Sequence, residues 1–165
     1  MKTGAGASQP HGNSCRAIMD KGIYTLVFRN PACTVRIGAL GEIAFPAGWH
    51  IYIGSALGSG GLKRLDRHIT LFRNRDKRPK WHVDYLLLAP EFTLAGAVSA
   101  STTEPFECGL ARKLGGQSIP GFGCSDCSCT SHLFFRKRVP LYEIEVAFRS
   151  LDLVPTIKTI ITDDT

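Results

Sequence analysis

The stretch GIYTLVF, residues 22–28, decides the fold of this chain. Its side chains alternate between two faces, and both faces carry β-forming residues: Ile23, Thr25 and Val27 on one, and Tyr24, Leu26 and Phe28 on the other. Strands that are apolar on both faces are buried on both faces. Residues 22–29 are therefore expected to form a central strand with packed layers above and below it.

Further strands are expected on both sides of this one in the sequence. Residues 49–54 predict a second central strand, which ends in the glycine-rich stretch GSALGSGG, residues 54–61. Between the two strands, residues 34–37 and 43–45 favour hairpin arms around Gly38 and Gly41. Residues 92–99 and 132–136 also favour strands, and residues 142–148 alternate as a last strand would.

Two helices are predicted with their boundaries. Four apolar residues recur at helical spacing from about Gly61: Leu62, Leu65, Ile69 and Phe72. Arg64 and His68 then share another face of this helix. A second helix begins after Thr103-Glu104-Pro105 and ends at Gly115-Gly116. Residues 80–88 fit a short helix or a strand equally well.

These elements predict an α+β fold with a small central antiparallel sheet, made of three core strands plus an inserted hairpin and flanked by helices. The 165 residues are enough for one hydrophobic core without disulfides. We expect a disordered leader at residues 1–19, one domain at residues 20–150 and a tail at residues 151–165.

The composition of the chain also bears on its expected location in the cell. No apolar run is long enough to cross a bilayer, and the start of the chain lacks the apolar block of a secretory signal. The expectation is a cytoplasmic protein with no membrane partner. The six cysteines are then expected to be reduced thiols or metal ligands rather than a disulfide framework.

The net charge is concentrated in one segment. Between residues 62 and 80 stand eight cations against Asp66 and Asp76, so this segment alone carries the +6 of the whole chain. A localised basic segment is the expected footprint of a polyanion such as nucleic acid. Seven of these cations are expected to contact DNA: Lys63, Arg67, Arg73, Arg75, Lys77, Arg78 and Lys80. The alternative is a solvated helix face and loop.

Several polar residues could carry out phosphodiester chemistry together. Cleavage needs a base that activates water, a cation beside the developing negative charge, and usually a metal held by a carboxylate. The candidates are Tyr24, Tyr52, Arg64, His68 and Glu107. A tyrosine acts as a base only when a neighbouring cation or metal-bound water assists it, and Arg64 could do so. Taken singly, each residue also fits a structural role in the core, on a helix face or in a first helical turn.

At this point the sequence resembles the GIY-YIG nuclease superfamily. The residues that carry the resemblance are GIY at 22–24, YIG at 52–54, and an Arg and a His one helical turn later. The resemblance implies a phosphodiesterase site with a single Mg²⁺ or Mn²⁺ ion. Tyr24 would be the general base, Tyr52 would line the site with Arg64 and His68, and Glu107 would bind the metal.

The similarity is greater to one subgroup, the "domain of unknown function 123" family, found alone or fused to endonuclease III. It rests on five stretches of the sequence: GIYTLVF, WHIYIGSALGSGGLKRLDRH, KWHVDYLL, ECGLARKL and IPGFGCSDCSCTSHLFF. They cover about residues 22–135.

Two polar clusters remain. Cys124, Cys127, Cys129 and His132 are suitable zinc ligands, but structural zinc sites usually separate two ligand pairs by a longer loop. We therefore favour a wall of the active cleft over zinc for this cluster. His82 and Asp84 are either a satisfied core pair or groups that support the metal ligands from behind.

The function expected from these observations is metal-dependent endonuclease cleavage of DNA in repair or processing. A noncatalytic nucleic-acid-binding module with the same fold is the alternative. A zinc-stabilised interaction domain is a second alternative. No small-molecule ligand is expected, and the oligomeric state stays open.

Overall fold

β1 (Gly22–Asn30) is the middle strand of the main sheet, and all but one of its residues are buried. The computed structural model describes residues 20–124 and 128–160. On one side β1 pairs with β4 (Gly48–Ala56), and on the other with β5 (Thr93–Ser101), antiparallel in both cases. The predicted central strand is thus confirmed, and so are its two core neighbours.

Two shorter strands complete the main sheet. β6 (Leu133–Arg136) pairs with β4, and β7 (Thr156–Thr159) pairs with β5, giving the order β6-β4-β1-β5-β7. All pairings are antiparallel, as the predicted α+β class requires. β7 lies beyond residue 150 and forms one outer strand of the sheet.

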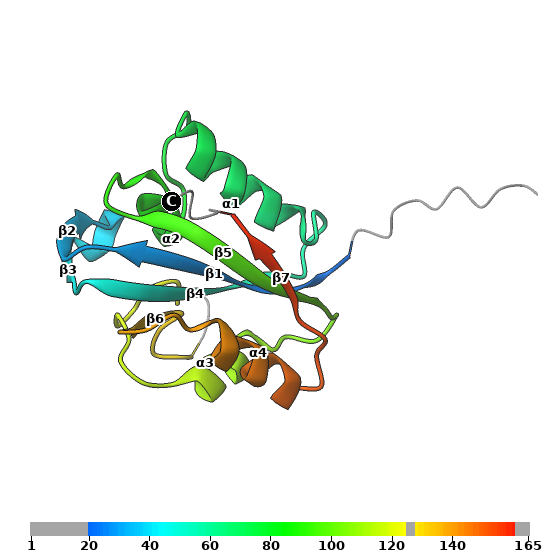
Figure 1. Ribbon diagram of the computed structural model, residues 1–165. Coiled ribbons are helices and arrows are strands. Elements are labelled where there is room, and N and C mark those ends of the chain that lie inside the picture. The colour runs from blue at the N-terminus through cyan, green and yellow to red at the C-terminus, as the bar shows by residue number, and fades with distance from the viewer. Residues whose placement is uncertain (1–19, 125–127, 161–165) are drawn as a thin grey trace, which may run out of the picture.

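The predicted hairpin lies at one end of the main sheet (Figure 1). β2 (Cys33–Arg36) and β3 (Glu42–Phe45) form a separate two-stranded sheet. A short 3-10 helix, Gly38–Leu40, connects them. Phe45 packs edge-on against Phe92, so the hairpin is anchored to the core of the domain.

Helices cover both faces of the sheet (Figure 1). α1 (Lys63–Asn74) and α2 (His82–Leu88) pack on the face that carries Tyr24, Leu26 and Phe28. α3 (Glu107–Leu114) and α4 (Leu141–Ser150) pack on the opposite face. Residues 80–88, for which the sequence left two structures open, thus include a helix.

α4 corrects one prediction, because residues 142–148 form a helix and not a last strand. The buried residues of α4 are Ile144, Ala147 and Phe148, which are spaced as one face of a helix. Tyr142 and Val146 made the sequence alternate, but both are exposed. The alternation therefore did not mark a buried face.

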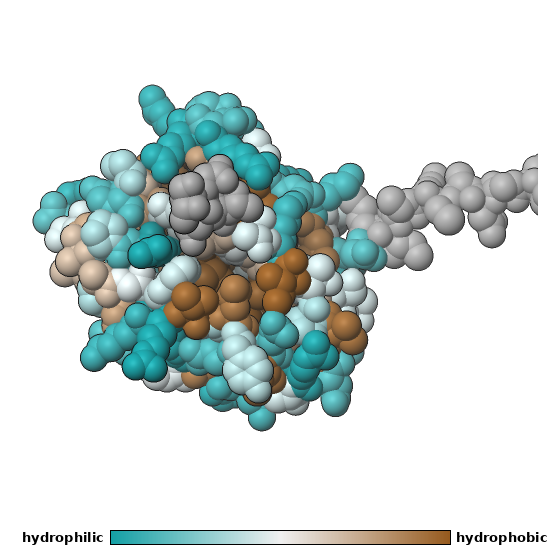
Figure 2. Space-filling view, viewed as in Figure 1, coloured by the Kyte–Doolittle hydropathy of each residue, from teal (hydrophilic) through white to brown (hydrophobic). Residues whose placement is uncertain are grey.

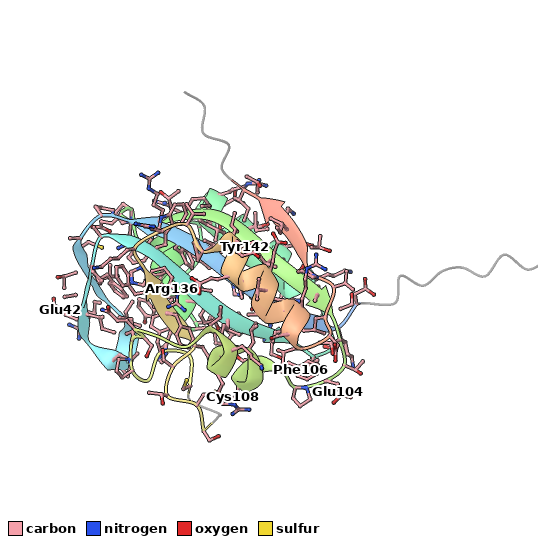
Figure 3. The ribbon with its side chains drawn as sticks, turned by 60° about the horizontal axis from the view of Figure 1, so that its bottom comes forward. Glu42, Glu104, Phe106, Cys108, Arg136 and Tyr142 are labelled. Atoms are coloured by element: carbon pink, nitrogen blue, oxygen red, sulfur yellow. A yellow bond between two sulfur atoms is a disulfide. The ribbon has the colours of Figure 1, made fainter. Side chains whose placement is uncertain are left out.

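Arg136 holds the α3/α4 layer against β6 (Figure 3). Its guanidinium donates to the carbonyls of Leu114 and Gly115, both at 2.8 Å, at the end of α3. It also forms an ion pair of 2.7 Å with Glu143 on α4. A cation is favourable at this position because the end of a helix carries partial negative charge.

An open groove lies on the α3/α4 face, between the sheet and α4. Figure 2 shows apolar side chains gathered there among polar ones. Val139 and Ile157 line the groove and are exposed, while the lining cations are Arg29, Lys137, Arg138 and Lys158. Its volume is about 1200 Å³.

The predicted leader, residues 1–19, lies outside the described residues. Among the helices that are described, none has the length and apolar character needed to cross a membrane.

Candidate active site

One pocket of about 310 Å³ brings together all five residues that the sequence marks for catalysis: Tyr24, Tyr52, Arg64, His68 and Glu107. The two tyrosines come from neighbouring central strands, β1 and β4. Arg64 and His68 come from α1, and Glu107 from the first turn of α3. Their roles stay predictions, but their convergence allows joint chemistry.

The GIY motif, residues 22–24, packs directly on the YIG motif, residues 52–54. Tyr24 pairs with Gly54 across the two strands, so the Tyr24 ring lies over the Gly54 backbone. A Cβ atom at residue 54 would lie 2.6 Å from Tyr24 Cε2 and still closer to the end of the ring. Because Gly54 has no side chain, the ring of Tyr24 can occupy the space above its backbone.

Tyr24 is hydrogen-bonded to His68, with 2.7 Å between the hydroxyl oxygen and Nε2. The pKa of His68 is lowered to about 4, chiefly by burial; the charge of Asp84 opposes this shift, and the charges of Arg64 and Arg67 add to it. His68 is then neutral at neutral pH, and its Nε2 can accept the hydrogen bond that Tyr24 donates.

Neither tyrosine ionises readily in this pocket. Burial raises the pKa of Tyr24 well above its usual 10, and the charge of Arg64 only partly offsets this. Burial likewise raises the pKa of Tyr52, with the charge of Glu107 adding to the effect. Tyr24 is therefore a neutral phenol, and Arg64 alone does not make it a base.

Arg64 is held in place from two sides. One of its amino groups donates to the carbonyl of Ser55 at 2.9 Å, which ties α1 to the end of β4. The guanidinium also lies over the ring of Trp81, 5.4 Å from its centroid. A stacked guanidinium keeps its charge while losing little freedom. The pocket thus contains a positioned cation.

Glu107 reaches the pocket from the other side of the sheet. α3 packs with the residues of the opposite face, such as Ile23 and Ile53, yet Glu107 lines the same pocket as Tyr24. Its Oε1 atom lies 2.9 Å from Nδ1 of His132, which immediately precedes β6. A partly exposed carboxylate thus lies close to the ring of the buried His132.

His82 and Asp84 differ in their surroundings. His82 lines the pocket, and its Nδ1 accepts a hydrogen bond of 2.9 Å from the backbone N–H of Gly123. Asp84 is only 4% exposed, and its carboxylate accepts from the backbone N–H groups of Lys80 and Trp81 at 2.8 and 3.1 Å. Asp84 thus caps the start of α2, and its negative charge raises the pKa of His68 against the effect of burial.

The cysteines correct the expectation of reduced thiols. Cys108, next to Glu107 on α3 (Figure 3), forms a disulfide with Cys129. The expectation rested on the general rule that cysteines of cytoplasmic proteins stay reduced. Formation of a disulfide also depends on distance, and the Cα atoms of Cys108 and Cys129 lie 5.9 Å apart, within the usual range. Cys129 also contacts His132, with 3.0 Å between Sγ and Nε2.

The structure describes three of the four residues in the predicted cluster: Cys124, Cys129 and His132. The thiol of Cys124 donates to the carbonyl of Phe122, with 3.5 Å between sulfur and oxygen. His132 lines the pocket. Cys127 lies outside the described residues.

The predicted DNA-contacting cations are all exposed: Lys63, Arg67, Arg73, Arg75, Lys77, Arg78 and Lys80. Lys80 lines the pocket itself. Its neighbours in sequence follow the end of α1, where Arg75 adopts a left-handed backbone conformation that terminates the helix.

Three pocket residues were missed by the sequence reasoning: Ser55, Trp81 and Gly123. Trp81 is half exposed, and its ring stacks on the guanidinium of Arg64. A signal was present, because Trp81 follows the basic segment directly. Ser55 acts through its carbonyl oxygen, which no sequence pattern reveals.

Fold and pocket together define a class: an antiparallel α+β domain whose polar pocket combines hydroxyl, imidazole, guanidinium and carboxylate groups. The chain belongs to the family described as Domain of unknown function DUF123, whose model matches residues 23–153. Neither a curated protein nor a solved structure matches the chain.

Proposed function

We propose that this protein is a metal-dependent endonuclease of the GIY-YIG type that cleaves phosphodiester bonds in DNA. The observation that carries the proposal is the convergence of Tyr24, His68, Arg64 and Glu107 on one pocket beside the basic segment. These groups supply a route for a proton, a cation for the phosphate and a carboxylate for a metal.

The donor set fits a hard divalent cation. Of the pocket-lining residues within the described part of the chain, Glu107 alone is acidic, and its carboxylate is partly exposed. Mg²⁺ keeps several water ligands and commonly takes only one or two protein carboxylates. Glu107 would hold Mg²⁺ or Mn²⁺, which would polarise the phosphate and stabilise its developing charge.

Tyr24 and His68 form a path for the proton of the attacking water. As the water attacks phosphorus, its proton passes to the Tyr24 oxygen, and the Tyr24 proton passes to Nε2 of His68. This relay avoids a free tyrosinate, which the raised pKa of Tyr24 opposes. Burial disfavours the imidazolium that forms, and the charge of Asp84 offsets part of this effect on the pKa of His68.

Arg64 and the basic segment would act on the phosphates. Arg64, fixed by Ser55 and Trp81, can bind the reacting phosphate and stabilise its charge in the transition state. The exposed cations that follow it along α1 and the next loop would bind the backbone without reading sequence.

A nuclease assay with matched variants tests the proposal. Branched, nicked and single-stranded DNA are incubated with the protein and Mg²⁺ or Mn²⁺, and DNA affinity is measured in parallel. We expect Tyr24→Phe to reduce cleavage by about 100-fold or more while affinity is kept, because only the proton path is lost. Glu107→Gln should abolish the response to the metal.

Tyr142→Phe is the matched control, because Tyr142 is 80% exposed on α4 and does not line the pocket. It should cleave like the wild type. Wild-type protein that binds these DNAs but cleaves none of them with either metal would reject the proposal. That outcome would favour a noncatalytic nucleic-acid-binding module with the same fold.

A further inference from the structure

A group of soft metal ligands lies beside the candidate active site. The ligand atoms of Cys108, Cys129 and His132 all lie within 4.8 Å of one another. They come from separate parts of the chain, the first turn of α3 and the segment that precedes β6. The disulfide between the two cysteines shows that these parts approach closely.

His132 has the orientation of a metal-binding imidazole. Its Nδ1 atom lies 2.9 Å from the Glu107 carboxylate, which favours the tautomer with the proton on Nδ1. The opposite atom, Nε2, lies 3.0 Å from Sγ of Cys129 and so faces the sulfur atoms. With the proton on Nδ1, Nε2 would offer its lone pair to a metal bound there. Metal-ligating histidines usually have a carboxylate or carbonyl behind them in this way.

We propose that Cys108, Cys129 and His132 bind one Zn²⁺ ion when the disulfide is reduced. A thiol reductant gives two electrons and two protons to the disulfide and is itself oxidised to its own disulfide. Each cysteine thiol then loses its proton to water as its sulfur binds the metal.

The ligand set suits zinc in number and in charge. Two thiolates and one imidazole are the ligands of a three-residue zinc site, in which water or a further ligand takes the fourth position. The two thiolate charges balance the charge of Zn²⁺, which favours binding where His132 is buried. Disulfide and zinc exclude each other, because both use the same two sulfur atoms.

The site would act on the geometry of the pocket. The disulfide joins α3 to the segment before β6, and a zinc ion bound to the same residues would do so too. Either connection would keep Glu107 next to His132. Reduction without metal removes this connection. The proposal concerns binding alone and does not depend on nuclease activity.

Co²⁺ is the probe, because thiolate ligands give it intense charge-transfer absorption. Full-length protein is treated with a thiol reductant, transferred to anaerobic buffer and titrated with Co²⁺ and then Zn²⁺. We expect one Co²⁺ per chain with thiolate-to-cobalt absorption, and displacement of Co²⁺ by Zn²⁺. Protein with the disulfide intact should show no such absorption.

Cys108→Ser, Cys129→Ser and His132→Gln should each lose the absorption or weaken binding by about 10-fold or more. Cys33→Ser is the matched control, because Cys33 lies on β2 outside the group, and it should bind like the wild type. Reduced wild-type protein without thiolate-to-cobalt absorption would overturn the proposal. So would an unchanged spectrum in Cys108→Ser, which would place the metal among the residues of the 124–132 segment alone.

A measurement on the wild type guards against variants that fail to fold. Alkylation of the reduced protein with and without Zn²⁺ is followed by mass spectrometry. Zn²⁺ should slow modification of Cys108 and Cys129 while leaving the rate at Cys33 unchanged. Equal slowing at all three would mean a general change of accessibility and would contradict a site at this group.

Discussion

Tyr24 and Gly54 form a single steric unit at the residue scale, although thirty positions separate them in the sequence. The Tyr24 ring fills the space that a side chain at residue 54 would need, and its hydroxyl reaches His68 from there. Tyr24 is buried, so its ring cannot move outward without leaving this hydrogen bond. The two motifs therefore depend on each other physically.

Replacing Gly54 with Ala tests this dependence. The added Cβ must displace the Tyr24 ring, and overpacking of this kind costs about 1–3 kcal/mol of unfolding free energy. Gly58→Ala is the control, because no atom lies within 4 Å of a Cβ at that position. Urea unfolding should show the loss in the first variant only. Equal stability of Gly54→Ala and the wild type would mean that the ring is not fixed.

His68 predicts a pH dependence of stability. Its pKa is about 4 in the folded protein, against 6.5 for an ordinary histidine, because burial disfavours the charged form. The unfolded chain thus binds the proton more tightly, and stability present above pH 6.5 is lost as the pH falls towards 4. The full loss from this residue is roughly 3 kcal/mol.

His50 has a pKa lowered to about 4 by the same cause, so two histidines contribute to the slope. Unfolding free energy measured from pH 7 to 4 should fall less steeply in His68→Gln, by about 1.4 kcal/mol per pH unit within this window. His50→Gln should give a similar change. A His68→Gln slope identical to that of the wild type would show that His68 is protonated in the folded state as readily as in water.

Among the secondary-structure elements, α4 shows why the sequence pattern wrongly predicted a strand at residues 142–148. Residues 142–148 alternate in apolar character, but the helical spacing of Ile144, Ala147 and Phe148 is superimposed on that alternation. Short apolar segments satisfy both periods, and only packing against a sheet decides between them. The neighbouring layer, which local pattern does not contain, selected the helix.

The helical face of α4 can be tested by two truncations. Phe148 is fully buried, so Phe148→Ala should destabilise the protein by about 3–5 kcal/mol through the cavity it leaves. Tyr142→Ala should change stability by less than about 0.5 kcal/mol, since Tyr142 projects into solvent. Thermal or urea unfolding measures both. Similar losses in the two variants would fit a strand with Tyr142 and Phe148 on one face.

For the whole molecule, the proposed contact of the basic segment with DNA predicts how binding would respond to salt. Replacing Arg73, Arg75, Lys77 and Arg78 with Gln should weaken binding to all DNA sequences alike. Each lost phosphate contact should lower the slope of log affinity against log salt concentration by about 0.9. The four side chains are exposed, so the fold should be retained.

A matched variant removes four exposed cations elsewhere: Arg112, Lys113, Lys137 and Arg138, also replaced with Gln. Both variants lose the same formal charge, so a difference between them reports location and not net charge. Binding measured across a salt series should keep its slope in this control. If the slope falls equally in both, the basic segment has no special role in contacting DNA.

Much of the architecture could be predicted because its signals are local. β1 and α1 each carry enough apolar side chains at one spacing to specify their own structure. The five pocket residues could be proposed because the resemblance connects them. The Cys108–Cys129 disulfide could not, because it depends on the contact between α3 and the segment before β6, residues far apart in sequence. The same holds for Trp81, whose role comes from where α1 places Arg64.

The two outer strands of the main sheet differ in a way that bears on self-association. Beyond β6, the backbone of Gln117 and Ile119 bonds to Phe135 and Leu133, so a loop occupies that edge. β7 is exposed at every residue, and within the described part of the chain no strand pairs with its outer side. An exposed edge can add a strand from another molecule. With one edge occupied, two copies joined through β7 would form a closed pair that cannot grow into a fibre.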